Sequence, residues 1–159
     1  SALAVDNIAL APILMDWTWN PASGRDPDAW WDSQIYDFMG VDHYVCYNDE
    51  SSCQDDGMLT GDWATIRAWA ATEGVDLAVG EWGMRGTDAD AGERVRSWFE
   101  HAVNSHQDGG GARVVGMAAF DSDPHNTESF ELAGEQLAAF HELMGDNRAA
   151  EPEPWSPSS

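Results

Sequence analysis

The sequence contains no lysine, and its seven basic residues, all arginine, are opposed by 29 acidic ones. The formal net charge is −22 at pH 7. A surface of this sign repels phosphate backbones and anionic lipids, so neither nucleic acid nor a membrane is an expected partner. An uncharged polysaccharide suits such a surface, although an adaptation to solubility or to high salt explains the acidity equally well.

Cysteine is nearly absent, with only Cys46 and Cys53 in the chain. Their spacing allows a small surface disulfide, which would indicate an oxidising compartment, while two free thiols remain the alternative. Two cysteines without a nearby histidine pair do not complete a zinc shell, and no cofactor or metal is expected. The chain also lacks any apolar run close to the ~20 residues that span a bilayer.

What is abundant is apolar and aromatic. Hydrophobic residues make up 43% of the 159, enough for one domain with its own core. The nine tryptophans favour an aromatic-lined binding surface. Residues 147–159, rich in proline, serine and glutamate, are expected to form a linker or tail after a domain over 1–146. Because the chain begins Ser-Ala-Leu-Ala, we expect the protein's true N-terminus to lie elsewhere.

Apolar runs typical of buried strands alternate with amphipathic stretches typical of helices. The expected strands are Ile8–Met15, Phe38–Tyr44, Val75–Gly80 and Val114–Phe120. The expected helices are Asp62–Glu73, one opened by Thr87, one capped by Thr127 with a stripe from Phe130 to Met144, and at most a short one near Ala29–Ile35. This alternation predicts an α/β fold with parallel strands.

Each expected strand ends in polar or aromatic residues, and a β/α barrel gathers such residues in one mouth. An open doubly wound sheet would usually carry a glycine-rich phosphate loop, and none of the known patterns occurs here. A complete barrel takes about 250 residues for eight strands, so four strands correspond to half of one. The alternatives are therefore a half-barrel and a small independent sheet.

Glu81 is the leading candidate for chemistry because it stands at the carboxyl end of the third expected strand, where barrels keep their catalytic groups. Trp82 beside it offers an aromatic face of the kind that packs on a pyranose ring. A solvated or helix-capping glutamate is the alternative.

Other candidates favour structural roles. Asp16 and Asp42 are expected to hydrogen-bond loops at the mouth, and His43 is expected on the opposite face of its strand from Tyr44. The segment containing Asp121, Asp123 and His125 could hold a metal, but ordinary turn chemistry explains it.

Four motifs in order resemble strands five to eight of clan A glycoside hydrolases, most closely glycoside hydrolase family 26. They are Trp17-Thr18-Trp19-Asn20-Pro21, Gly40-Val41-Asp42-His43-Tyr44, Gly80-Glu81-Trp82-Gly83 and Phe120-Asp121. The resemblance covers about Asn7 to Met144. It implies that this chain is the C-terminal half of a TIM (β/α)8 barrel, with the N-terminal half as its missing partner.

The resemblance implies a secreted retaining glycosidase that cleaves β-linked mannan, xylan or glucan. Glu81 would be the nucleophile, and Tyr44 would hydrogen-bond it. Asp42 would contribute to substrate binding, and the platforms that line the subsites would be Trp17, Trp19, Trp82 and Phe120.

The acid/base glutamate of the family closes strand four, upstream of this chain, and Phe120 stands where the family usually has tryptophan. Without that glutamate, the isolated chain is expected to be inactive. The alternatives are a glycan-binding module that does not cleave, and a half-barrel that is not a functional unit by itself.

Overall fold

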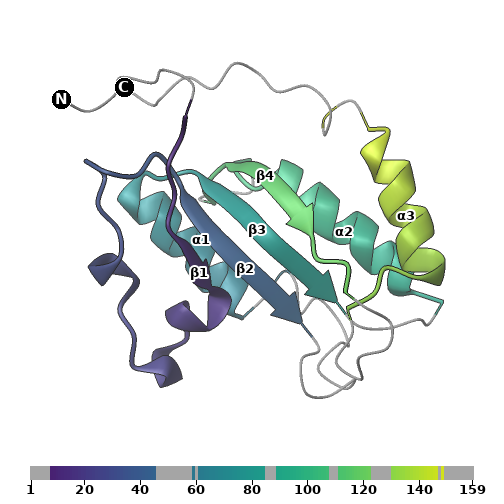
Figure 1. Cartoon of the computed structure of the whole chain (residues 1–159), viewed down its shortest axis with the longest axis horizontal. Coiled ribbons are helices and arrows are strands. Elements are labelled where there is room, and N and C mark those ends of the chain that lie inside the picture. The colour runs from purple at the N-terminus through teal and green to yellow at the C-terminus, as the bar shows by residue number, and fades with distance from the viewer. Residues whose placement is uncertain are drawn as a thin grey trace.

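The computed structural model describes residues 8–45, 59, 61–84, 89–107, 111–122, 130–146 and 148. Within them, four strands form one parallel sheet in the order β1-β2-β3-β4 (Figure 1). The strands are β1 Ile13–Met15, β2 Met39–Val45, β3 Leu77–Met84 and β4 Val114–Ala119. The helices are α1 Asp62–Glu73, α2 Ala91–Val103 and α3 Gly134–Met144, with 3-10 turns η1 Asp16–Trp19, η2 Pro21–Ser23 and η3 Pro27–Ala29. The predicted alternation and the parallel sheet are confirmed.

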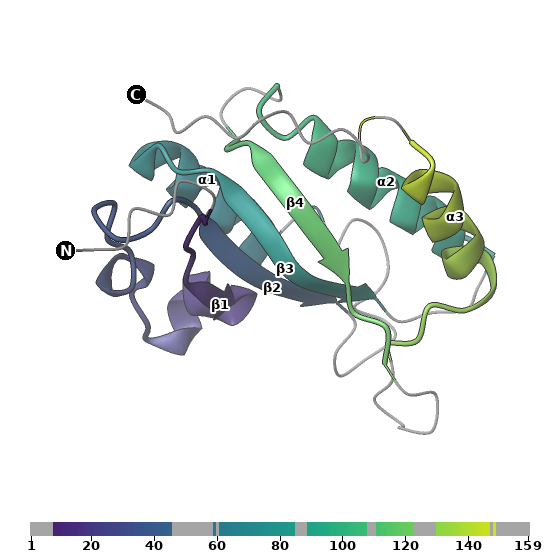
Figure 2. The ribbon, with the colours of Figure 1, turned by 45° about the horizontal axis from the view of Figure 1, so that its top comes forward.

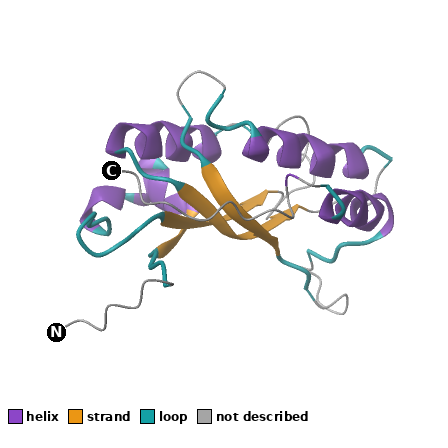
Figure 3. Ribbon diagram, turned by 90° about the horizontal axis from the view of Figure 1, so that it is seen from above, coloured by secondary structure: helices purple, strands orange, loops and turns teal. Residues whose placement is uncertain are grey.

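All three α-helices lie on one side of the sheet. Figure 3 shows them along one face of the strands, and Figure 2 shows α2 and α3 beside the β4 edge. Right-handed crossovers from each parallel strand to the next place helices on one face, as in a barrel wall. None of the helices in this described part is long and apolar enough to cross a bilayer.

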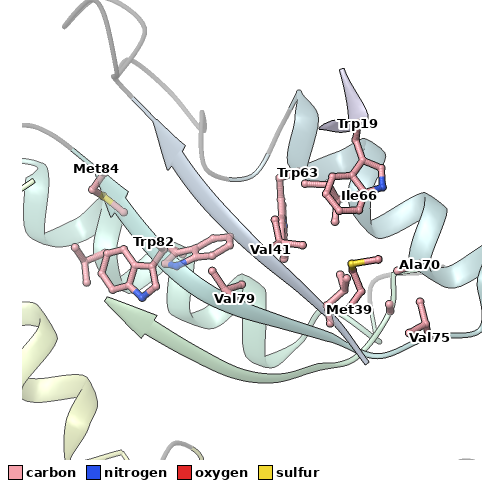
Figure 4. Packing of buried hydrophobic residues seen from close by; sticks show 14 of the residues in the cluster. Trp19, Met39, Val41, Trp63, Ile66, Ala70, Val75, Val79, Trp82 and Met84 are labelled. Carbon is pink, nitrogen blue, oxygen red and sulfur yellow. The ribbon is translucent and has the colours of Figure 1, made fainter. Parts of the chain in front are cut away.

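The core lies between the sheet and these helices. Met39, Val41, Leu77 and Val79 alternate along β2 and β3 and are at most 2% exposed, which is the pattern of a strand face turned to a core. Figure 4 labels Met39, Val41 and Val79 of this set. Figure 4 also shows Trp63 and Ile66 of α1 above β2.

Much of the tryptophan is buried, against the expectation that it lines a binding surface. Trp63 and Trp98 are fully buried, with ring centroids 4.9 Å apart, and Trp19 and Trp82 are 5% and 3% exposed. These large rings fill the space between helices and sheet, where each removes far more apolar area from water than an aliphatic side chain.

The observed bounds correct several expectations at the ends of helices. α1 spans the predicted residues and ends at Gly74 with φ 66°, a left-handed conformation that glycine adopts readily. However, Gly61 is its N-cap, and Asp62 lies in its first turn. α2 begins after Asp90. Phe130 precedes α3 and lies outside the helix, while Thr87 and Thr127 lie outside the described residues.

The first strand is shorter than predicted. Only Ile13–Met15 pair with β2, and Pro12, which precedes them, has no backbone N–H with which to extend the ladder. Its Ile13 and Met15 are 58% and 41% exposed. The loop after η1 contains η2 and η3 in place of the short helix expected near Ala29–Ile35.

Candidate active site

A β-bulge in β3 sets the direction of Glu81. Val41 of β2 pairs with Val79, and the next residue of β2, Asp42, pairs with Glu81, so Gly80 is an extra residue in β3. The register with β4 shifts in the same interval. In an unbroken strand Glu81 would share the buried helix face with Val79, because side chains alternate with a period of two. The bulge turns Glu81 instead to the face of the sheet that the helices leave open.

The hydroxyl of Tyr44 donates a short hydrogen bond to Oε2 of Glu81. Tyr44 lies near the end of β2, and both residues are only partly buried. Charge-assisted hydrogen bonds of this kind are stronger than neutral ones and fix the orientation of the carboxylate. The predicted contact between Tyr44 and Glu81 is therefore present, at the carboxyl end of two neighbouring parallel strands.

Aromatic rings hold Tyr44 on both sides. Its ring lies 4.8 Å from Phe130 and 5.8 Å from Phe120, measured between centroids, and the Phe120 contact is edge-to-face at 83°. Phe130 is 6% exposed and Phe120 is 38% exposed. Phe120 thus keeps part of its ring open beside Tyr44, as a platform for a ligand requires.

Asp42 lies beside Glu81 on β2. Its pKa is raised above 3.8, first by burial and then by the negative charge of Glu81, while a hydrogen bond from the Glu81 backbone acts in the opposite direction. Oδ1 of Asp42 is buried and has no hydrogen-bond partner among the described residues. Asp42 therefore contacts the backbone of the β3 bulge. We expected it to hydrogen-bond a loop at the mouth instead.

Beneath the open face, Asp16 links η1 to β2. Its Oδ2 lies 2.8 Å from Nδ1 of His43 and 3.3 Å from the backbone nitrogen of Tyr44. His43 is 2% exposed and stacks on Trp63 at 5.5 Å with 23° between the rings. The prediction that His43 points away from Tyr44 and serves a structural hydrogen bond is confirmed.

Of the four aromatic rings predicted to line sugar subsites, two are accessible and two are buried. Trp17 is 45% exposed and its backbone N–H donates to Asp16 at 2.6 Å, while Phe120 is accessible as described. Trp82, in contrast, is turned into the core, 6.2 Å from Phe140 of α3 (Figure 4). Trp19 packs edge-on against Trp69 at 5.5 Å. The burial of Trp19 and Trp82 corrects the expectation that their faces line subsites.

The remaining candidates lie partly outside the described residues. Asp121 accepts the backbone N–H of Leu132 through Oδ1 at 3.0 Å, a contact between residues eleven positions apart that joins the end of β4 to the segment before α3. Asp123 and His125 are outside the described ranges, as are Cys46 and Cys53. Among the residues that are described, no group of three or more His, Cys, Asp or Glu side chains could hold a metal ion.

Two features of the site escaped the sequence analysis. The bulge at Gly80 has no clear sequence signal beyond the glycine itself. Phe130 was assigned to a helical stripe, because a single phenylalanine after a loop gives no indication that it returns to the sheet. The Gly83 that closes the Gly-Glu-x-Gly motif was the available signal for close packing at this point.

Comparisons with known proteins give one view of the fold. No family model and no curated protein sequence matches the chain. Among solved structures, it is similar to the catalytic domain of the Bacillus sp. JAMB-750 GH26 endo-β-1,4-mannanase, with a TM-score of 0.54 and 21% sequence identity. The match covers 87% of this chain and 38% of that chain.

The fold is therefore that of part of a β/α barrel. The chain spans 38% of the length of the mannanase domain, and its four parallel βα units correspond to a partial barrel. The resemblance to glycoside hydrolase family 26, predicted from four short motifs, is confirmed at the level of the fold.

Proposed function

We propose that this chain supplies the C-terminal half of a retaining glycoside hydrolase, with Glu81 as its nucleophile. The observation that carries the proposal is the hydrogen bond from Tyr44 to Glu81 on the open face of the sheet, at the carboxyl ends of parallel strands. Barrel enzymes place their catalytic groups at this end.

The geometry suits a nucleophile for a physical reason. The Tyr44 hydroxyl fixes one carboxylate oxygen of Glu81, and the β3 bulge directs the side chain away from the core. In the reaction, a Glu81 oxygen bonds to the anomeric carbon while the glycosidic C–O bond breaks and a second carboxyl group protonates the leaving oxygen. Water then bonds to the anomeric carbon and gives a proton to that second carboxylate, while the bond from this carbon to the Glu81 oxygen breaks and the Glu81 carboxylate is restored.

That second carboxyl group is proposed to come from the N-terminal half of the barrel. Asp42 is the carboxyl group next to Glu81, but it accepts a hydrogen bond from the Glu81 backbone and so belongs to the support of β3. A retaining enzyme needs its two carboxyl groups about 5–5.5 Å apart across the scissile bond. A glutamate closing strand four of a complete barrel would meet this need.

The proposed substrate is an uncharged β-linked polysaccharide. The net charge of −22 disfavours anionic polymers, and the exposed rings of Trp17 and Phe120 offer faces for sugar packing. The similar solved structure is described as an endo-β-1,4-mannanase, which makes mannan the first substrate to test, followed by xylan and β-glucan. Secretion belongs to the same proposal, because polymers of this kind are degraded outside the cell.

The test is hydrolysis by a protein that carries both halves of the barrel. We expect Glu81→Gln to remove nearly all release of reducing sugar, by a factor of about 10⁴ or more, while oligosaccharide binding stays within about threefold of the parent. Glu93→Gln, which changes an exposed carboxylate on the outer helix α2, is the matched control. Near-normal turnover by the Glu81 variant would remove Glu81 from the role of nucleophile.

A glycan-binding module is the second candidate, favoured because Asp42, the register partner of Glu81, accepts a hydrogen bond from the β3 backbone. Titration of the 159-residue chain with mannan, xylan and β-glucan oligosaccharides separates the two. Saturable binding together with no hydrolysis by the two-half protein supports the binding module. Hydrolysis that depends on Glu81 supports the enzyme.

A further inference from the structure

Gly83 lies directly under the ring that holds the proposed nucleophile. A Cβ atom built at Gly83 would come within 2.9 Å of Cδ1 and Cε1 of Tyr44, and within 2.9 Å of Cδ1 of Phe130. Real Cβ atoms do not approach carbon this closely, and the obstacles are two packed rings. Tyr44 and Gly83 are also register partners on β2 and β3. The position therefore admits glycine alone while Tyr44 keeps its place.

Phe130 closes the other side of this arrangement and is itself fixed. Its backbone N–H donates to the hydroxyl of Ser122 at 2.6 Å, which ties the segment before α3 to the end of β4. Two residues on, the backbone of Leu132 donates to Asp121. With only 6% of Phe130 exposed, the ring cannot swing into solvent to make room for a larger residue at position 83.

From this packing we infer that Gly83 and Phe130 are positioning residues for Tyr44. The flat surface of the β3 backbone at Gly83 and the ring of Phe130 form a slot that sets the height of the Tyr44 ring. The slot brings its hydroxyl to Oε2 of Glu81. The inference deepens the proposed function, on which its effect on catalysis rests, whereas the slot itself rests on the geometry alone.

Unlike ordinary core packing, the slot controls the position of the Tyr44 hydroxyl relative to Glu81. A methyl group at position 83 would push the Tyr44 ring outward by a few tenths of an ångström or more, and hydrogen-bond strength falls steeply with such a displacement. Gly116 on β4 offers the comparison, because a Cβ there meets nothing within 4 Å. Both are strand glycines without positive φ, so the backbone cost of alanine is equivalent at the two sites.

The first experiment is a double-mutant cycle on the unfolding of the 159-residue chain, using Gly83→Ala, Tyr44→Phe and the two combined. We expect Gly83→Ala to raise the unfolding equilibrium constant by about tenfold more in the parent than in the Tyr44→Phe background, since the hydrogen bond is already gone there. The clash itself is common to both backgrounds and cancels. Gly116→Ala should show the same effect in both backgrounds.

A second variant protects the test if Gly83→Ala does not fold. Phe130→Leu is close in volume but removes the ring face beside Tyr44, and it should show the same dependence on the Tyr44 hydroxyl. Equal effects of Gly83→Ala, or of Phe130→Leu in its place, in the two Tyr44 backgrounds would overturn the inference and leave simple core packing.

Turnover distinguishes this inference from the proposed function. In the two-half protein, Gly83→Ala and Tyr44→Phe should each lower kcat by a similar factor with little change in KM, and the double variant should lose no more than either alone. If the variants are coupled in unfolding but no hydrolysis depends on Glu81, the positioning role of Gly83 and Phe130 stands and the proposed enzymatic function is wrong. If hydrolysis depends on Glu81 but the effects of Gly83→Ala and Tyr44→Phe on kcat are additive, the enzymatic function stands and the positioning role is wrong.

Discussion

The carboxylates of Asp42 and Glu81 lie on adjacent strands of a chain that is already strongly acidic. Burial disfavours the charged form of Asp42, and the negative charge of Glu81 adds to this effect. The electrostatic repulsion that the Glu81 carboxylate causes on the open face therefore appears in part as the raised pKa of Asp42. This makes the stability of the site dependent on pH.

The sign of that dependence follows from the raised pKa of Asp42. Between 3.8, its ordinary value, and its higher value in the folded chain, the folded state binds more protons than the unfolded state, so stability falls as pH rises. We expect Asp42→Asn to gain stability relative to the parent as the pH increases from 3.8 and to hold that gain at neutral pH. Urea unfolding of both proteins at pH 4 and pH 7 measures the difference.

Asp146 supplies a control of opposite sign. Hydrogen bonds from Arg148 lower the pKa of this partly exposed carboxyl to about 2, so its contribution to stability is present above pH 3.8 and is lost as the pH falls toward 2. Asp146→Asn should therefore lose stability relative to the parent at neutral pH but not at pH 2. A difference between Asp42→Asn and the parent that is unchanged from pH 4 to pH 7 would contradict the role of Asp42.

At the scale of residues, the sequence motifs predicted which side chains meet. They did not predict which face of the sheet a side chain takes. The contact between Tyr44 and Glu81 was implied by the resemblance of their two motifs to glycoside hydrolase family 26, and it is present. Trp82 was placed wrongly because adjacency to Glu81 says nothing about which face a side chain takes. The pairing register decides that face, and a one-residue bulge is invisible in the pattern of apolar residues.

At the scale of elements, the helices and strands are held by different means. α1 is tied to the end of α2 by Arg67, whose Nε and Nη2 donate to the side chain and backbone of Ser105 at 2.9 and 2.8 Å. Its apolar face packs on β2 through Trp63 and Ile66, both fully buried. The core contact of α1 is thus made by a few large side chains.

Removal of one such side chain should be costly. Trp63→Ala is expected to lower the free energy of unfolding by about 3–5 kcal/mol, because it leaves a cavity between Trp98 and His43 that the helix cannot close. Trp30→Ala, at a ring that is 59% exposed, should change it by less than about 0.5 kcal/mol. Chemical denaturation compares them, and similar losses at both positions would show that Trp63 does not hold the core.

The existence and order of these elements could be predicted, whereas several ends could not. Gly74 and Gly145 stop their helices as expected, since a glycine after an amphipathic stretch is a strong local signal. The predicted first strand was too long because Ile8–Ala11 are as apolar as a strand, yet these residues form no bridge with β2. Which residues pair depends on the neighbouring strand, so the sequence of one strand alone does not predict it.

At the scale of the whole molecule, the sheet has one face that the helices cover and one that, within the described residues, they leave open. Its edge strands, β1 and β4, each pair with a single neighbour in this part of the chain. Exposed apolar side chains gather at both edges, with Ile13 and Met15 on β1 and Val115 on β4. An apolar groove lined in part by Val103, Val115, Phe140 and Met144 opens beside β4. Unpaired strands with apolar flanks favour pairing with another chain, and we propose the N-terminal half of the barrel as that partner.

We expect this chain to form a one-to-one complex with the N-terminal four βα units, seen as a shift in size-exclusion chromatography. Ile13→Asp, which places a charge on the β1 edge, should weaken the complex by at least about tenfold. Ile35→Asp is the matched control, with 54% exposure against 58% for Ile13, in the loop before β2 and outside the strand ladder. A clean monomer that unfolds cooperatively and ignores the N-terminal units would contradict the proposed partnership.

The order of the strands in space is also their order along the chain, with every neighbour one crossover away. During synthesis, each strand after β1 thus leaves the ribosome when the strand beside it has already been made. Pairings that are local in sequence close small loops and form early. The protein can accordingly assemble vectorially, from β1 toward β4, with the β4 edge as the last to be completed.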